Sequence, residues 1–192
     1  MAGPQIFQAL DLEMNSTGTI IQVGTCVGYL DDSFHIENQE GWIIRTDEEI
    51  DPKITELTGI KTEDVRGPHS VPLEVAYRGM CKTHQNTGAF INLVTWGGPD
   101  GEILRAQLPA NLEWRFGRRW IDVKTIYTYE CLIRGKHPAG GLSKSMGRMG
   151  LKFVGTEHNA VHDAFNTMSF LLEMVKRRVL AHKCLTQAQS FG

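Results

Sequence analysis

The sequence has few cysteines, and no two of them lie close together. The four are Cys26, Cys81, Cys131 and Cys184, and no C-x-x-C pair occurs in the 192 residues. Zinc ribbons, thioredoxin-like redox sites and disulfide frameworks depend on paired or closely spaced cysteines. The spacing therefore argues against these classes and predicts a reduced, cytoplasmic protein.

Long hydrophobic runs are also missing. No stretch approaches the roughly 18 apolar residues that a membrane-spanning helix requires. Near the N-terminus, Pro4 and Gln5 interrupt any candidate signal peptide, and no apolar segment of the required kind follows them. We therefore expect no membrane partner.

The chain has little net charge, −2 at pH 7, so its total charge gives no general attraction to nucleic acid. The distribution is uneven, because residues 31–64 are strongly acidic and residues 131–156 lack Asp and Glu. This second segment contains Arg134, Lys136, Lys144, Arg148 and Lys152. The asymmetry is compatible with a polyanion that approaches one side. Two solvated faces would give the same pattern, and charge alone favours that simpler interpretation.

Hydrophobic alternation and turn residues predict a mixed sheet. Three strands near the N-terminus are joined by short turns and should form an antiparallel meander over residues 6–14, 19–30 and 34–45. Residues 89–95 form a compact apolar run that suits a strand buried on both faces. The last strand is predicted over residues 120–123.

Helix signals alternate with the later strands. Asp51 and Pro52 are typical of a helix start, and Gly59 should end that helix at about residue 58. Apolar spacing predicts further helices over residues 73–84, 101–108, 122–133, 142–149 and 159–181. The sequence therefore predicts a single α/β domain over residues 1–192, with helices flanking the sheet.

Two carboxylates share one face of the first predicted strand. Asp11 and Glu13 are two residues apart and project together, whereas Leu10, Leu12 and Met14 point to the other face. Burying carboxylates is unfavourable unless a cation or a metal neutralises them. The pair is a candidate metal site, although a solvent-exposed face with polar alternation would also explain it.

Asp100 follows the apolar run of residues 89–95 through a Gly-Gly-Pro turn. Ligands of α/β sheets bind beyond the ends of strands, so a carboxylate at this point is well placed. Pro-Asp-Gly is also a common turn triplet. Taken alone, Asp100 is better explained as an ordinary turn residue.

Residues 155–167 place two histidines and an aspartate at the start of the last predicted helix. His158 and His162 are four apart, which suits a zinc site, but no Glu lies between them and no third soft ligand is evident. His158 and Asp163 are five apart, about 140° around an ideal helix, and do not share a face. They converge if His158 lies on the loop before the helix, as a turn at Gly155 allows. His162 is then a flanking residue. This segment alone fits surface residues equally well.

Taken together, these residues resemble the DEDDh exonucleases, 3′→5′ nucleases with a ribonuclease H-like fold. An Asp-x-Glu on the first strand, an Asp after a later strand and an Asp on the final helix form the carboxylate set, which His158 completes. The most specific match is His158-x-Ala160-x-x-Asp163-Ala164-x-Asn166-Thr167. The similarity runs from residue 7 to about residue 172, and residues 54–60 are closest to the Eri-type RNA exonucleases.

The second motif departs from the common pattern of an Asn followed by an aromatic-Asp pair. Residues 95–100 read Thr-Trp-Gly-Gly-Pro-Asp, which is closer to the Trp- and Gly-containing Eri-type version. Asp122, at the end of the last predicted strand, is the alternative ligand if Asp100 points away from the site.

The resemblance implies a ribonuclease H-like sheet with three antiparallel strands followed by two parallel ones. It also implies a 3′→5′ exonuclease that uses two Mg²⁺ or Mn²⁺ ions to hydrolyse single-stranded RNA or DNA and release nucleoside monophosphates. Asp11, Glu13, Asp100 and Asp163 would hold the ions, and His158 would be the general base, since an imidazole accepts protons near neutral pH.

Several alternatives stay open. RNA-degrading and DNA-trimming members share these motifs, so the sequence does not choose between the two substrates. A catalytically silent module that recognises 3′ ends or a protein partner could use the same fold. The family contains monomers and dimers, which leaves open a homodimer or a targeting partner protein.

Substrate contacts are also implied by the resemblance. One group would grip the terminal nucleotide, and a second would contact phosphates. The candidates are Met14, Leu57, Thr58 and Ile60 for the nucleotide, and Lys144, Arg148 and Lys152 for the phosphates. The cluster over residues 114–120 could stack bases, but packing beside an edge strand is the favoured interpretation.

Overall fold

Five strands form one mixed sheet in the computed structural model, which describes residues 5–31, 33–138 and 140–189, and only the backbone of 183–189. The strand order is β3-β2-β1-β4-β5. The strands are β1 (Gln5–Met14), β2 (Ile20–Leu30), β3 (His35–Ile43), β4 (Val94–Thr95) and β5 (Ile121–Asp122). β1 pairs antiparallel with β2 and β2 with β3, whereas β1–β4 and β4–β5 are parallel. The predicted arrangement is confirmed.

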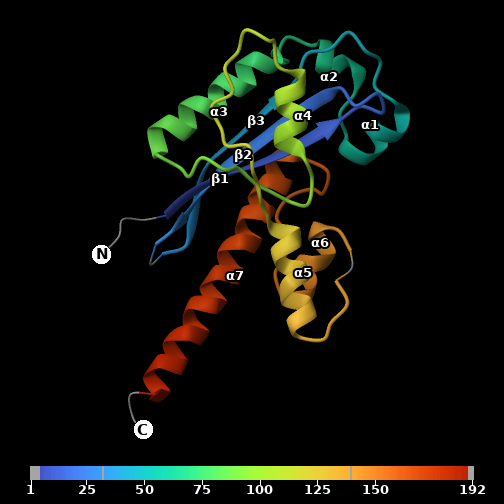
Figure 1. Cartoon of the computed structure of the whole chain (residues 1–192). Coiled ribbons are helices and arrows are strands. Elements are labelled where there is room, and N and C mark those ends of the chain that lie inside the picture. The colour runs from blue at the N-terminus through green and yellow to red at the C-terminus, as the bar shows by residue number, and fades with distance from the viewer. Residues whose placement is uncertain (1–4, 32, 139, 190–192) are drawn as a thin grey trace.

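Helices cover both faces of this sheet (Figure 1). In the view of Figure 1, α3 and α4 lie above the sheet, and α5, α6 and α7 lie below it. The helices are α1 (Pro52–Thr58), α2 (Thr62–Arg66), α3 (Leu73–Thr87), α4 (Asp100–Gln107), α5 (Val123–Ile133), α6 (Leu142–Arg148) and α7 (Ala160–Gln189). Each face has its own apolar core, one containing Met168 and Phe170 of α7 and the other containing Tyr77 and Met80 of α3.

The ends of two helices, α1 and α7, show which helix boundaries the local sequence predicts correctly. The Asp51 side chain accepts a hydrogen bond from Lys53 N–H, and Gly59 ends α1 with φ of 77°, as predicted. α7 instead runs past the predicted end at residue 181. No Gly or Pro occurs between residues 160 and 189, so nothing in that segment breaks the helix. The short helix α2 was not predicted from the sequence.

The strand predicted over residues 89–95 is much shorter, and only Val94–Thr95 joins the ladder. Phe90 and Ile91 are each 50% exposed, so burial on both faces holds only from Leu93 onward. The backbone before the strand makes single bonds to different partners: Phe90 N–H donates to Ile6 O, and Gly117 N–H donates to Ile91 O. These scattered bonds replace a regular ladder.

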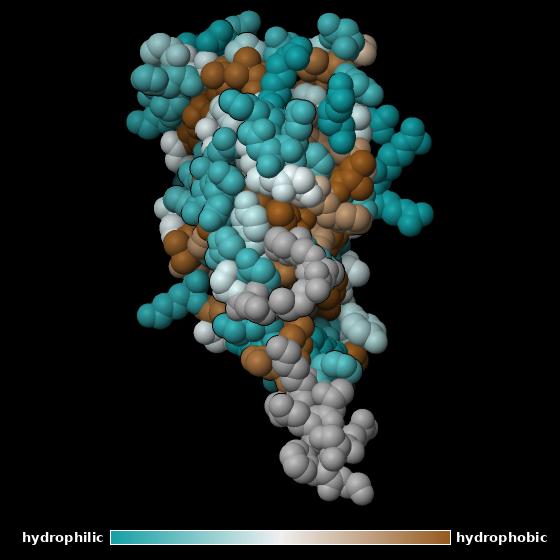
Figure 2. Space-filling view, turned by 90° about the vertical axis from the view of Figure 1, so that its left-hand side faces the viewer, coloured by the Kyte–Doolittle hydropathy of each residue, from teal (hydrophilic) through white to brown (hydrophobic). Residues whose placement is uncertain are grey.

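The side of the molecule shown in Figure 2 is mostly hydrophilic. Hydrophobic side chains lie there in small groups between charged and polar residues, not in one broad patch. In the part of the chain that the structure describes, no helix has the length and apolar character needed to cross a bilayer.

The N-terminal turn of α7 lies against β2 at a position where a side chain would not fit. A Cβ added to Gly24 would lie 2.1 Å from the carbonyl carbon of Ala160 and 2.3 Å from the nitrogen of Val161. These are backbone atoms, which cannot rotate away as a flexible side chain would. The glycine therefore fixes how closely the helix approaches the sheet.

We predict that Gly24→Ala lowers the free energy of unfolding by about 1–3 kcal/mol or more, the usual cost of overpacking a core. The matched control is Gly147→Ala in α6, where an added Cβ meets nothing within 4 Å. In that helix Ala is expected to be neutral or stabilising. Thermal unfolding followed by circular dichroism measures both variants, and equal melting temperatures would contradict the close packing at Gly24.

Candidate active site

The candidate site begins on the central strand, β1. Asp11 and Glu13 project from the face of β1 that α7 covers, while Leu10 and Leu12 are buried in the core on the α3 side. The alternation predicted from the sequence is thus present. Because β1 lies in the middle of the sheet, both carboxylates are held on a rigid element and are partly removed from water.

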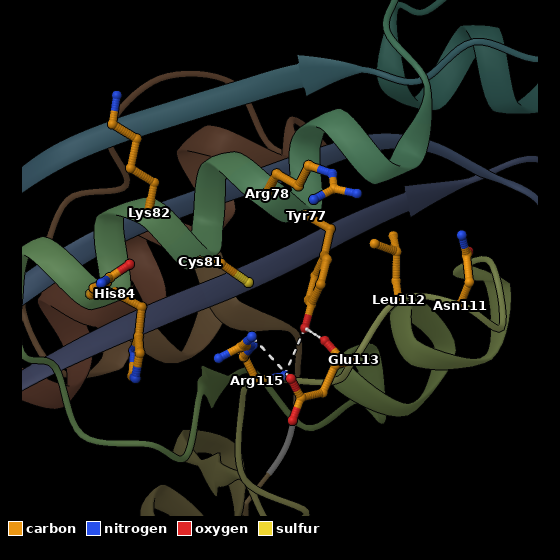
Figure 3. A pocket seen from close by; sticks show the side chains of 10 residues that line it. Tyr77, Arg78, Cys81, Lys82, His84, Asn111, Leu112, Glu113 and Arg115 are labelled. Atoms are coloured by element: carbon orange, nitrogen blue, oxygen red, sulfur yellow. Dashed lines mark hydrogen bonds and ion pairs between the residues drawn. The ribbon is translucent and has the colours of Figure 1, made fainter.

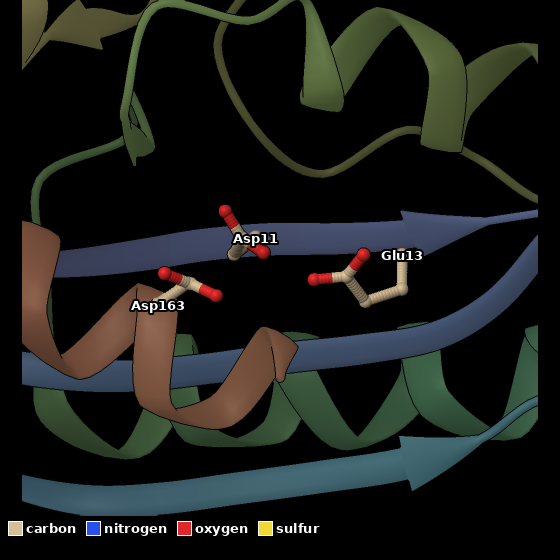
Figure 4. A group of neighbouring side chains, drawn as sticks. All are labelled: Asp11, Glu13 and Asp163. Carbon is tan, nitrogen blue, oxygen red and sulfur yellow. The ribbon is translucent and has the colours of Figure 1, made fainter. Parts of the chain in front are cut away.

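α7 brings a third carboxylate to this pair. One oxygen from each of Asp11, Glu13 and Asp163 can be chosen so that all three lie within 4.8 Å of one another. Figure 4 shows Asp163 on the first turns of α7, pointing toward the strand that carries the other two. Residues 152 apart in the chain therefore form one compact group, as expected from the sequence.

The contact between the start of α7 and β2 explains how Asp163 is positioned. In the β1–β2 ladder Glu13 pairs with Gln22, and Asp11 pairs with Gly24. The Gln22 side-chain oxygen accepts a hydrogen bond of 2.9 Å from Ala160 N–H, at the start of α7. This bond satisfies an N–H group that has no partner within the helix. The residues beside the two acids on β1 therefore position the helix that delivers the third acid.

Asp100 adds its charge to the same site from α4. It is the first residue of that helix, and its negative charge raises the pKa values of both Asp11 and Glu13. Burial raises the pKa of Asp100 itself to about 6. Its oxygens are outside the group that lies within 4.8 Å.

Asp122, the alternative ligand, has a different task. Its carboxylate caps α5 by accepting bonds from the N–H and the hydroxyl of Thr125. The same carboxylate accepts a bond of 3.0 Å from Gly97 N–H, in the loop that leads to Asp100. The geometry therefore gives Asp100 a place facing the acids and gives Asp122 a structural role.

Burial and mutual repulsion raise the pKa values across the site. Burial is the main cause of the raised pKa of Asp11, followed by the charges of Asp100, Asp163 and Glu13. Burial and the charges of Asp163 and Asp100 raise the pKa of Glu13 to about 7. The pKa of Asp163 is also raised by burial, although the nearby His158 opposes this rise.

The group fits a divalent cation that prefers oxygen ligands. Among the described side chains, no Lys or Arg forms an ion pair with these carboxylates. Clustered, partly buried carboxylates without a positive partner are unfavourable unless protons or a metal neutralise them. Mg²⁺ and Mn²⁺ take hard oxygen ligands of this type.

His158 lies on the loop before α7, as expected from the sequence. Its φ is 58°, and its backbone N–H donates to the Asp163 carboxylate. The chain turns three residues earlier at Gly155, where φ is 85°. His158 is exposed, and it lies near enough to Asp163 to lower the pKa of that carboxyl group.

His162 holds that loop in shape. Its Nδ1 accepts a hydrogen bond of 3.0 Å from Thr156 N–H. Its ring lies 2.5 Å from where a Cβ at Gly155 would be, so the glycine allows the ring to pack against the loop. The four-residue spacing of the histidines thus serves a loop contact, and neither histidine belongs to the group of possible metal ligands in the described chain.

The candidate nucleotide contacts differ in exposure. Leu57 is 48% exposed, whereas Ile60 is 5% exposed and packs with Ile21 and Val65. Ile60 therefore supports its segment from inside the core. The Thr58 hydroxyl donates to Ile54 O and accepts from Ile60 N–H. Met14 is partly buried against the core on the α3 side.

The candidate phosphate contacts lie on or near α6. Lys144 and Arg148 are both exposed residues of that helix. The Arg148 guanidinium also donates to His137 O at 3.4 Å and so braces the preceding loop. Lys152 follows α6 and is exposed as well.

Comparison with known proteins supports the fold. No family model and no curated protein matches this chain. The nuclease domain of 3′hExo, a DEDDh family member bound to rAMP, matches with a TM-score of 0.75 and 16% identity over 92% of this chain and 94% of that domain. Cell-death related nuclease 4 (CRN-4) matches with a TM-score of 0.74 and 17% identity over 90% of this chain.

A more distant match is E. coli exonuclease I in complex with a dT13 oligonucleotide, with a TM-score of 0.63 and 14% identity over 94% of this chain. The chain spans 64% of CRN-4 and 43% of exonuclease I. These likenesses establish that the chain has the ribonuclease H-like fold of DEDDh exonuclease domains, which confirms the fold expected from the motifs.

The raised pKa values predict how stability depends on pH without metal. Between about pH 4, where free carboxyl groups ionise, and about pH 7, the folded protein keeps protons that the unfolded chain has lost. The free energy of unfolding should therefore fall as pH rises through this window. Asp163→Asn removes the neighbouring charge that raises the pKa of Glu13 most. In this variant the free energy of unfolding should fall less steeply with pH.

Melting temperatures between pH 4.5 and 8, measured in a chelator and again in excess Mg²⁺, test this prediction. Mg²⁺ should raise the melting temperature more at pH 8 than at pH 5, because bound cation replaces the lost protons. Asp47→Asn, at an exposed position, is the matched control. A chelated protein whose stability rises with pH would contradict the predicted repulsion.

Proposed function

We propose that this chain is a metal-dependent 3′→5′ exonuclease that removes nucleoside monophosphates from single-stranded RNA or DNA. The observation that carries the proposal is the convergence of Asp11, Glu13 and Asp163 within 4.8 Å. Asp100 adds a fourth charge, and His158 lies beside Asp163. The fold likeness to exonuclease domains supports the same conclusion.

In the proposed mechanism the carboxylates bind two Mg²⁺ or Mn²⁺ ions. When bound, the ions neutralise the charge that develops on the phosphate and favour proton loss from the attacking water. By resemblance, Asp11, Glu13 and Asp163 would hold the ions, and Asp100 would assist them directly or through water.

His158 is the proposed general base. Its backbone N–H donates to the Asp163 carboxylate, so His158 lies next to a residue that would hold a metal ion. The side chain is exposed and can pass the proton that it takes from water on to solvent. The left-handed backbone at this residue keeps the imidazole out of the helix.

The proposed grip on the substrate has two parts. The exposed Leu57, together with Thr58 and Met14, would contact the terminal nucleotide, and Ile60 would support this segment from the core. The exposed Lys144, Arg148 and Lys152 would contact backbone phosphates. Contacts of this type do not read sequence, which suits an enzyme that shortens a strand stepwise.

We predict that Asp11→Ala and Asp163→Ala each abolish Mg²⁺-dependent shortening of a 5′-labelled single-stranded oligonucleotide. Each removes an oxygen ligand from the compact group. Asp47→Ala, an exposed acid outside this group, should keep full activity. Gel analysis of the products measures shortening, and unchanged activity in either folded site variant would refute the proposed role of that residue.

We predict that His158→Ala lowers turnover by about 10²–10⁴-fold, the usual contribution of general acid–base catalysis. Metal binding should change little, because the carboxylates stay in place. Isothermal titration with Mn²⁺ measures binding, and single-turnover assays measure the rate. If metal affinity falls together with the rate, His158 is a ligand and not a base.

Matched RNA and DNA oligonucleotides, labelled at the 5′ or the 3′ end, test direction and substrate. Stepwise loss from the 3′ end in one or both arms is expected. If purified protein is inactive on every strand with both Mg²⁺ and Mn²⁺, the silent binding module becomes the better explanation.

A cytoplasmic location and a homodimer or targeting partner belong to the proposal as well. Cell fractionation tests the location, and light scattering tests the oligomeric state.

A further inference from the structure

A groove lies on the opposite side of the sheet from Asp163. It has a volume of about 960 Å³ and runs between α3 and the segment that joins α4 to β5 (Figure 3). We call it the α3 groove; its lining includes Tyr77, Arg78, Lys82, His84, Glu113 and Arg115. Leu10 and Leu12 pack in the same core as Tyr77, whereas the acids of β1 project to the other face. The groove is therefore separate from the carboxylate site.

The wall opposite α3 is fixed in place. The Tyr77 ring stacks on Trp114, with ring centres 5.6 Å apart and an angle of 12° between the planes. The Tyr77 hydroxyl donates to Glu113 O and accepts from Arg115 N–H, both at 2.7 Å. Trp114 therefore packs against the helix α3, whereas the sequence had favoured packing beside an edge strand. A wall held in this way loses little entropy when a ligand binds.

The groove gathers positive charge. Arg78 and Lys82 are one turn apart on α3, and both are exposed. Like charges at this spacing destabilise a helix slightly, and neither residue forms an ion pair within the described part of the chain. Arg115 reaches the groove from the other wall, where Glu113 binds it at 2.9 Å. The cations thus outnumber the single carboxylate.

A polar atom at the groove also has no partner. His84 Nδ1 is buried and forms no hydrogen bond, while its ring meets Phe116 edge-on at 5.1 Å. Buried polar atoms without partners are uncommon in folded proteins and often mark a place where a ligand or water binds. The His84 ring lines the groove, and its unpartnered Nδ1 lies beneath the groove surface.

We propose that the α3 groove binds the phosphate group of a nucleotide. Guanidinium groups contact phosphate oxygens in pairs, and an ammonium group adds a point charge. The phosphate would belong either to a part of the strand far from its 3′ end or to a free nucleotide. The choice of a nucleotide, among other anions, rests on the proposed nuclease function.

The test measures binding in a chelator, where the carboxylate site lacks metal and repels phosphate. Fluorescence anisotropy follows a 5′-labelled single strand of 12 nucleotides, and equilibrium dialysis follows AMP and adenosine. The variant R78Q/K82Q removes two exposed charges from the groove. The matched control R105Q/K176Q removes two exposed charges from α4 and α7.

We expect R78Q/K82Q to weaken binding about tenfold. The control variant R105Q/K176Q should bind as tightly as the wild-type chain. For the strand, the slope of log K against log salt should fall by about 1.4, since each neutralised phosphate of a single strand contributes about 0.7. Loss of strand binding alone identifies the strand as the source, and loss of AMP binding alone identifies a free nucleotide. Equal binding by both variants, or adenosine that binds detectably and as tightly as AMP, would overturn the proposal.

Hydrolysis of a trinucleotide in Mg²⁺ separates this proposal from the proposed function. R78Q/K82Q should cleave it at the wild-type rate, because the groove lies on the other face of the sheet. If the wild-type chain binds phosphate in the groove but cleaves nothing, only the exonuclease proposal fails. If it cleaves the trinucleotide but the groove binds no phosphate, only the groove proposal fails.

Discussion

Repulsion among carboxylates is the constraint on which the rest of the site depends. Asp11, Glu13 and Asp163 are held closer than isolated acids would stay, and burial strengthens their mutual repulsion. The sheet and α7 supply the opposing free energy, because the helix covers β1, β2 and β3 with apolar side chains. A protein that folds around such a group must accept lower stability at neutral pH or take up a cation. The folded chain therefore holds a negative charge that a bound cation would neutralise.

Local chemistry made much of this site predictable. Side-chain alternation along a strand was enough to place Asp11 and Glu13 on one face, and the turn at Gly155 was enough to separate His158 from the helix that carries Asp163. Each of these inferences depends on the geometry of only a few consecutive residues. Features that depend on so few residues can be predicted from the sequence, and they are present in the folded chain.

Contacts between distant segments were not predictable in the same way. Nothing near Gln22 indicates that its amide would accept a bond from Ala160, and nothing near Gly24 indicates that a helix backbone would lie against it. The strand at Val94 ends early because its preceding backbone bonds to several different partners. The α3 groove was missed for the same reason, since its walls come from separate parts of the chain.

The bond between Gln22 and Ala160 joins residues 138 apart, so the carboxylate group is assembled in two stages. The β1–β2 hairpin, with its two acids, can pair as soon as it leaves the ribosome, because its contacts are local. Asp163 follows Glu13 by 150 residues. A partly synthesised chain that ends before α7 therefore carries only two of the three clustered carboxylates, and the repulsion among all three arises only when that helix docks.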